Sequence, residues 1–172
     1  VVVGSRMAYR AAPEAGIEFD NLSGERDYSV GRAYAHSKLA NRLFSLELAR
    51  QLKGSRITSN CLHPGVINTN MARRESRLVR AAWGWYTSVL GKTIAQGAAT
   101  SCYVATSPLL GATSGAYFED CNAVTVSGEH HLNDDEMAAE LWQVSESLVG
   151  EHLVRHQRPD WRELRHGRQP SE

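Results

Sequence analysis

The sequence lacks a surplus of either charge, because 19 basic residues stand against 19 acidic residues in 172. A balanced charge gives no bulk attraction for nucleic acid, so we expect no nucleic-acid partner. Cysteine is scarce too: Cys61, Cys102 and Cys121 are far apart and match no metal-ligand spacing or disulfide framework. We therefore expect no metal site, a reducing compartment and a cytoplasmic location.

Long apolar runs are also missing, since none approaches the roughly 20 residues that cross a bilayer. The first residue is not methionine, and the chain opens on VVVGS. Three β-branched residues predict a buried strand of a parallel sheet, which needs a neighbour on each side. We therefore expect a segment upstream of Val1, which could carry further cofactor-binding, targeting or anchoring residues.

The order of the segments indicates an α/β fold. Residues 6–29 predict a long loop with short turns, residues 31–54 a long helix and residues 56–65 a short strand. A strand, a helix and a strand in this order predict a right-handed crossover. The helix has two apolar rows, which together predict a broad buried face: Leu39, Leu43 and Leu46, and Phe44, Leu48 and Leu52.

Capping signals mark two later helices. Thr93 and Gln96 match a capping box for a helix that ends before Pro108. Asn133 and Glu136 predict the same for a helix that ends near residue 150. Between these helices, GAYFEDC at residues 115–121 predicts the last strand.

Tyr34 and Lys38 lie four residues apart near the start of the first long helix, so their side chains share one face. An ammonium held beside a phenol favours the phenolate, which makes a group able to exchange a proton with a carbonyl or alcohol oxygen. The bland alternative is a boundary tyrosine and a solvated lysine. The neighbouring motifs favour the pair, because VVVGS precedes YAHSK and HPGVINT follows it.

These motifs, in this order, resemble the short-chain dehydrogenase/reductase family. VVVGS resembles its serine-bearing strand, YAHSK its Y-x-x-x-K and PGVINT its P-G-x-x-x-T turn. SKLANRLFSLELARQLKG and later segments, up to about Leu153, are most similar to the retinol dehydrogenase and WW-domain-containing oxidoreductase branch. The resemblance implies that residues 1–154 form the C-terminal half of a doubly wound, parallel-sheet Rossmann fold in three α/β/α layers. Residues 155–172 are a polar tail, for which we expect disorder.

The resemblance also implies the catalytic roles. Tyr34 would be the general acid/base, and Lys38 would favour its phenolate and bind the nicotinamide ribose. Ser5 would hold the substrate oxygen, although a serine at a strand end also caps turns. Gly4 stands where the family often has another serine, and we expect this replacement to be tolerated.

The turn after the second strand would bind the cofactor. Pro64 and Gly65 would let the backbone around Ile67 approach the carboxamide, and Thr69 would bind the carboxamide or a phosphate. Beside the turn, we expect His63 to bond to backbone rather than to shuttle protons. The implied cofactor is NAD(P), and the branch resemblance favours NADP over NAD. The family's T-G-x-x-x-G-x-G phosphate turn is absent from these 172 residues, so we expect the isolated chain to be inactive and poorly soluble.

Residues 70–92 mix large apolar side chains with arginines, and here Trp83 and Trp85 would line a site for a lipophilic aldehyde, ketone or alcohol. An ordinary amphipathic helix and an interfacial helix on anionic lipid are the alternatives. The implied function is an oxidoreductase that transfers a hydride between nicotinamide and this substrate. A related epimerase or dehydratase and a non-catalytic dinucleotide-binding or scaffolding protein remain as alternatives. A homodimer is expected only by analogy with the family.

Overall fold

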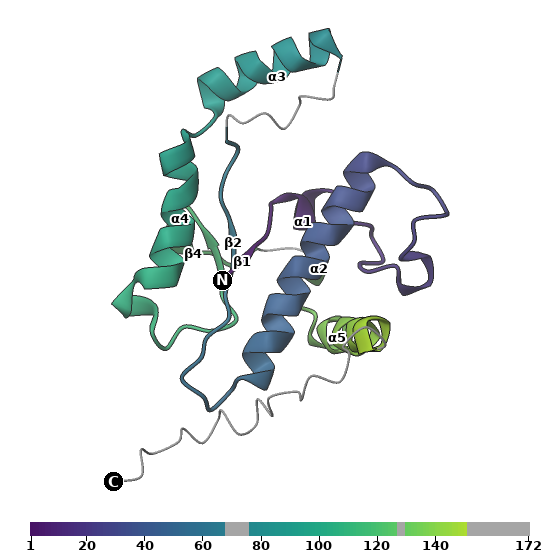
Figure 1. Ribbon diagram of the computed structural model, residues 1–172, viewed down its shortest axis with the longest axis vertical. Helices are drawn as coiled ribbons and strands as arrows, with labels where there is room; N and C mark the ends of the chain where they lie inside the picture. Colours follow the sequence, from purple (N-terminus) through teal and green to yellow (C-terminus); the bar gives the residue numbers. More distant parts are fainter. Residues whose placement is uncertain (68–75, 127–129, 151–172) are drawn as a thin grey trace.

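The computed structural model describes residues 1–67, 76–126 and 130–150 (Figure 1). In this part of the chain, four strands form one sheet in the order β1-β2-β3-β4: β1 (Val2–Val3), β2 (Cys61–His63), β3 (Tyr117–Glu119) and β4 (Asn122–Ala123). The strands β1, β2 and β3 are parallel, whereas β4 pairs antiparallel with β3. The predicted last strand is therefore followed by one more, which makes the sheet mixed.

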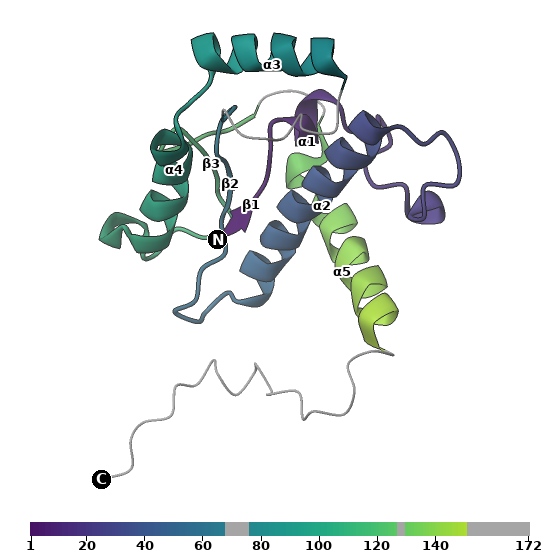
Figure 2. The same cartoon turned by 45° about the horizontal axis from the view of Figure 1, so that its top comes forward.

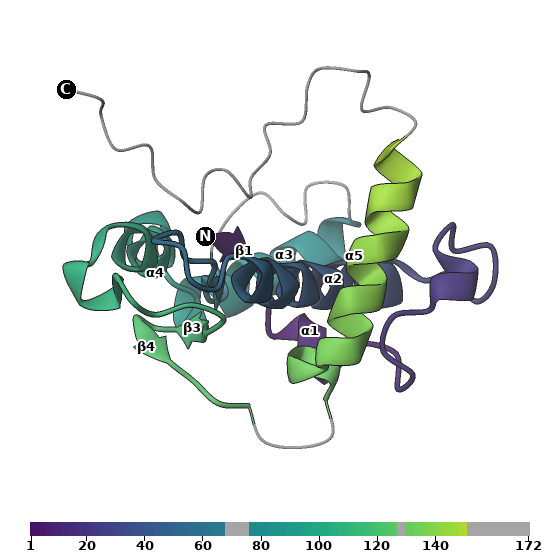
Figure 3. The same ribbon diagram turned by 90° about the horizontal axis from the view of Figure 1, so that it is seen from below.

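Helices cover both faces of the sheet, which confirms the three-layer α/β/α class. The helices α2 (Val30–Gln51) and α5 (Asp135–Gly150) lie on one side, and α4 (Ile94–Thr106) lies on the other (Figures 1 and 3). The short α1 (Met7–Arg10) follows β1, and α3 (Arg77–Leu90) lies at the end of the molecule where α2 begins (Figure 2). None of the described helices is long and apolar enough to cross a membrane.

The opening valines form a strand, but the strand is not buried as predicted. Val1 is 56% and Val3 is 47% exposed, because β1 lies at the edge of the described sheet. Its ladder joins β2, with the Val2 amide donating to the Asn60 carbonyl at 2.8 Å and the Gly4 amide to the Leu62 carbonyl at 2.7 Å. A β-branched run predicts extended backbone, whereas burial depends on what packs beside it.

The helix α2 supplies the centre of the core, although its buried face differs from the predicted one. Leu39 and Leu43 are fully buried, as predicted, in a cluster that includes residues of α1 and α5. Phe44 is 43% exposed and instead stacks on Trp142 of α5, with ring centroids 5.4 Å apart. Three polar residues are buried where the apolar pattern gives no hint of it: Arg42, Ser45 and Glu47.

One predicted capping box is confirmed and the other is wrong. The Gln96 amide donates to Thr93 Oγ1 at 3.2 Å, and the Thr93 amide donates to Gln96 Oε1 at 2.9 Å. At α5 it is Asp134, rather than Asn133, that accepts from the Met137 amide at 2.9 Å. The Asn133 side-chain oxygen is engaged by Arg42 Nη2 at 2.6 Å, so a tertiary contact shifts the cap by one residue.

Candidate active site

Ser5 lies at the carboxyl end of β1, where the chain turns into α1. Its side chain is buried, and its Oγ accepts a hydrogen bond from the Met7 amide at 3.2 Å. The serine therefore caps the turn, as the bland reading of the sequence expects. A hydroxyl has two lone pairs and one proton, so this bond leaves the proton available for another acceptor.

Tyr34 and Lys38 lie in the second and third turns of α2, which begins at the cap formed by Ser29. The Lys38 ammonium lies 5.7 Å from the centroid of the Tyr34 ring, close enough for a favourable cation–π contact. Lys38 Nζ also donates to the Val3 carbonyl at 3.2 Å, which ties the pair to the strand that leads to Ser5. Tyr34 remains 38% exposed and thus open to a small molecule.

Asn41, which the sequence analysis does not single out, supports this arrangement. Its Nδ2 donates to the same Val3 carbonyl at 3.2 Å, so that two side chains of α2 hold the end of β1. Its position three residues after Lys38 places both on one helix face, and this spacing is the signal that could have identified it.

The Pro64–Ile67 turn follows β2 and is fixed by the segment that leads into α4. Gly65 has a left-handed backbone with φ of 91°, and an added Cβ would lie only 2.7 Å from Lys92 Cδ. The Lys92 amide donates to the Val66 carbonyl at 2.7 Å. Ile67 packs against Gly97 of α4, where an added Cβ would lie 2.3 Å from Ile67 Cδ1. The left-handed backbone therefore favours glycine at residue 65, and a Cβ at residue 97 would require the Ile67 side chain to shift, while Thr69 lies outside the described residues.

His63, the last residue of β2, is buried and neutral in character. Burial lowers the pKa of its imidazole, and the Arg6 amide donates to its Nδ1 at 3.4 Å. The ring is therefore bonded to backbone, as expected from its place beside the turn.

The glycine that precedes Ser5 has a packing reason. A Cβ at Gly4 would lie 2.8 Å from Cys61 Sγ and 3.2 Å from the Leu62 carbonyl oxygen. Cys61 is fully buried, and burial raises the pKa of its thiol to about 11, so this sulfur is an apolar filler rather than a nucleophile. In this chain Cys61 occupies the space that a side chain at residue 4 would need.

A cluster of charged residues, which sequence reasoning missed, surrounds the ends of β1 and β3. Glu119 is buried and accepts from Arg6 Nε at 2.8 Å and from the Tyr9 hydroxyl at 3.0 Å. The next residue, Asp120, pairs with Lys92. No local pattern reveals a contact between residues that are 113 positions apart, as Arg6 and Glu119 are.

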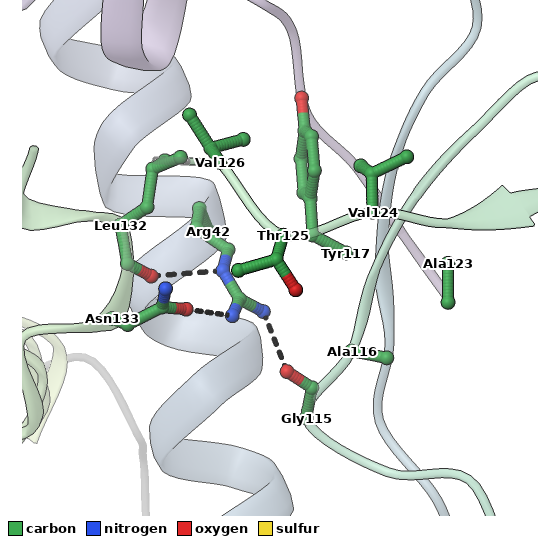
Figure 4. Close-up of a pocket in the computed structure, with 10 residues that line it drawn as sticks. All are labelled: Arg42, Gly115, Ala116, Tyr117, Ala123, Val124, Thr125, Val126, Leu132 and Asn133. Carbon is green, nitrogen blue, oxygen red and sulfur yellow. Dashed lines mark hydrogen bonds between the residues drawn. The ribbon is translucent and has the colours of Figure 1, made fainter. Parts of the chain in front are cut away.

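Arg42 is another buried charge that the sequence did not indicate. Figure 4 shows its guanidinium between two chain segments, where it donates to the Leu132 carbonyl at 2.9 Å, the Gly115 carbonyl at 2.9 Å and Asn133. A pocket of about 230 Å³ adjoins it, lined by Arg42, Gly115, Ala116, Tyr117, Ala123, Val124, Thr125, Val126, Leu132 and Asn133. None of the predicted site residues lines this pocket. The three hydrogen bonds of Arg42 connect α2 to the residues before β3 and to the segment before α5.

The predicted substrate residues lie on α3. Trp85 is 70% exposed, whereas Trp83 is half-buried, with its ring centroid 5.8 Å from that of Tyr86. The helix lies at the end of the molecule where α2 begins, near the carboxyl ends of the parallel strands (Figures 1 and 2). Its position suits a wall of the site, and a role for either tryptophan in binding stays a prediction.

Comparisons with known proteins agree with this geometry. A sequence model of the short chain dehydrogenase family matches residues 20–78. Human retinol dehydrogenase 11 is 44% identical over 134 residues, which are 78% of this chain and 41% of that protein. The chloroplastic short-chain dehydrogenase TIC 32 B of Brassica napus is 43% identical over 147 residues, which are 84% of this chain and 45% of that protein.

A solved structure shares the fold. A crystal structure of an uncharacterised protein from Mycobacterium paratuberculosis superposes with a TM-score of 0.57 at 28% identity, covering 86% of this chain and 48% of that one. The chain thus spans less than half the length of the relatives named here. The motifs, their placement in the fold and these likenesses show that the chain belongs to the short-chain dehydrogenase/reductase family and is related to the retinol dehydrogenases.

Proposed function

We propose that this chain carries the catalytic residues of an NAD(P)-dependent oxidoreductase. The reaction would transfer a hydride between nicotinamide and the carbonyl or alcohol group of a lipophilic small molecule. The observation that supports this proposal is the position of Lys38, whose ammonium lies 5.7 Å from the Tyr34 ring and is bonded to β1 two residues before Ser5. Lys38 thus links the helix that carries Tyr34 to the strand that leads to Ser5.

Each side chain has a distinct task in this proposal. Tyr34 gives its phenolic proton to the carbonyl oxygen during reduction and takes it back during oxidation. The Ser5 hydroxyl donates to the same oxygen and stabilises the charge that develops there. Lys38 has three donors, one of which is used by Val3, so two remain to favour the phenolate and to bind a ribose hydroxyl.

The described residues fit the nicotinamide end of a dinucleotide. The Pro64–Ile67 turn is bonded to Lys92 through the Val66 carbonyl and is partly exposed, so its backbone groups would meet a carboxamide. A bound NAD(P) would supply or accept the hydride. Its pyrophosphate would need a glycine-rich turn that is absent from these 172 residues. The aligned residues cover only 41% of retinol dehydrogenase 11, so that relative has room for such a turn, and the branch resemblance favours NADP.

The proposed substrate is lipophilic because α3 offers apolar and aromatic side chains beside the site. Leu78, Trp85 and Val89 are exposed at intervals that place them on one helix face. Similarity to retinol dehydrogenase 11 points in the same direction, since retinol is a lipophilic alcohol. Trp85 would then form a wall of the binding site, whereas Trp83, two residues earlier, lies on another face of α3 and would contribute from there.

The experiment that tests this function is Tyr34→Phe in the protein that carries this chain. We expect kcat for carbonyl reduction with NADPH to fall by about 10²–10⁴-fold, because the proton donor is lost while the ring is retained. Tyr28→Phe is the matched control, since Tyr28 is 67% exposed on the preceding loop. Undiminished hydride transfer by Tyr34→Phe would refute the mechanism. Dinucleotide binding without any turnover by the unmodified protein would favour the scaffolding alternative.

A further inference from the structure

The turn between β3 and β4 is a two-residue hairpin loop between Glu119 and Asn122, a type of loop that needs left-handed backbone at both of its residues. Asp120 has φ of 50° and Cys121 has φ of 62°, so two successive residues other than glycine adopt left-handed conformations. Aspartate is among the residues that tolerate this conformation. Here the Cys121 amide donates to Thr100 Oγ1 of α4 at 3.2 Å. The turn is therefore fixed to α4 as well as to the two strands that it joins.

The turn places the Glu119 carboxylate against the segment that follows β1. Glu119 Oε2 accepts from Arg6 Nε at 2.8 Å and lies 2.7 Å from Arg6 Nη2, while Oε1 accepts from the Tyr9 hydroxyl at 3.0 Å. The side chain of Glu119 is only 10% exposed. A buried carboxylate with both oxygens bonded is a stiff link, unlike an ion pair on the surface.

Both partners of Glu119 belong to the segment that holds Ser5. Arg6 is the next residue, and its amide is bonded to His63 Nδ1 at 3.4 Å, so Arg6 is fixed through its backbone and through its side chain. Tyr9 lies in α1, and the Met7 amide of the same helix donates to Ser5 Oγ at 3.2 Å. Movement of Glu119 would therefore displace the serine hydroxyl without any direct contact.

We propose that Glu119 is a positioning residue, which fixes the Ser5 hydroxyl through Arg6 and Tyr9. This inference rests on the proposed function, in which Ser5 binds the substrate oxygen. A displacement of about 1 Å at a reacting group can cost up to roughly 100-fold in rate. Glu119, the last residue of β3, thus presents its carboxylate across β2 to the end of β1.

The first test is a double-mutant cycle between Glu119→Gln and Ser5→Ala. Glutamine keeps the size of the side chain, but an NH2 group replaces one of the two acceptor oxygens. A glutamine side chain therefore cannot accept the bonds from Arg6 and Tyr9 in the positions that the two carboxylate oxygens occupy. We expect Glu119→Gln to lower kcat by about 10-fold when Ser5 is present and by less than about 2-fold in the Ser5→Ala background. Equal losses in both backgrounds would show a merely structural role and overturn the proposal.

The second test does not depend on turnover. Hydrogen exchange of the Met7 amide reports the bond to Ser5 Oγ, and we expect it to accelerate by about 10-fold in Glu119→Gln. Asp20→Asn is the matched control, because it weakens an exposed ion pair with Arg26, 2.6 Å long, on the loop before α2. An unchanged exchange rate of the Met7 amide would refute the proposal that Glu119 holds Ser5 in position. Absence of hydride transfer in the unmodified protein would instead refute the proposed function, while the exchange experiment would still decide whether Glu119 holds Ser5.

Discussion

The helices α2 and α3 begin with the same type of cap but differ in how deeply their apolar side chains are buried. Each is capped by a serine: Ser29 accepts from the Arg32 amide, and Ser76 accepts from the Val79 amide. Yet Leu39 and Leu43 of α2 are fully buried, whereas Leu78 of α3 is 84% exposed. Local signals thus determine where both helices start, and tertiary packing determines what each can do.

This difference suits two separate tasks. The helix α2 is held by the sheet on one side and by α5 on another (Figure 3), so that Tyr34 and Lys38 keep fixed positions. A general acid needs such rigidity, because proton transfer requires hydrogen-bond geometry. The helix α3 has an apolar face that no described residue covers, which is appropriate for a surface that meets a lipophilic substrate.

The largest expected effect is a difference between the two helices in how much one substitution changes the free energy of unfolding. Leu43→Ala in α2 should lower the free energy of unfolding by about 3 kcal/mol, because it leaves a cavity in the core. Trp85→Ala in α3 should change the same quantity by less than about 0.5 kcal/mol, since that ring is 70% exposed. Urea denaturation of the protein that carries this chain measures both. A comparable loss from Trp85→Ala would show that α3 is packed against something outside the described contacts.

A smaller effect is expected at the end of β1, where packing is close rather than extensive. Gly4→Ser should destabilise the protein by about 1–2 kcal/mol, because the new Cβ meets Cys61 Sγ at 2.8 Å. The additional change Cys61→Ala should recover much of this loss by removing the sulfur. Thermal unfolding of the single and double variants is the measurement. If Gly4→Ser is neutral by itself, the close contact does not explain the glycine.

The sequence predicted those features that depend on neighbouring residues. The Tyr34 and Lys38 pair and the Thr93 capping box follow from helix periodicity and from hydrogen bonds within one turn. The burial of Arg42 and the link between Arg6 and Glu119 depend on segments that meet only after folding. Phe44 was placed on the core face because periodicity cannot distinguish a contact with the sheet from a stacking contact with Trp142.

The smallest expected effect concerns His63, a titratable residue that is buried at the end of β2. Burial lowers the pKa of His63 below its ordinary 6.5, and Glu119, Arg6, Lys92 and Asp120 are the charged groups that act on it. The unfolded chain binds a proton at His63 more readily than the folded protein does. The free energy of unfolding therefore keeps its full value with respect to His63 above about pH 6.5, and it decreases as the pH falls from there through the lowered pKa.

His63→Asn should therefore flatten the loss of stability below pH 6.5, because asparagine does not titrate and retains an acceptor for the Arg6 amide. The free energy of unfolding, measured by denaturation between pH 7.5 and about pH 5, gives the slope for each variant. Other groups titrate in the same range, so the quantity to compare is the difference between the two slopes. His130→Asn is the control for replacing a histidine, since His130 is exposed. An identical slope in His63→Asn would mean that His63 binds a proton equally well in the folded protein and in the unfolded chain. The end of β2 would then resemble the exposed helix α3 rather than the packed region around α2.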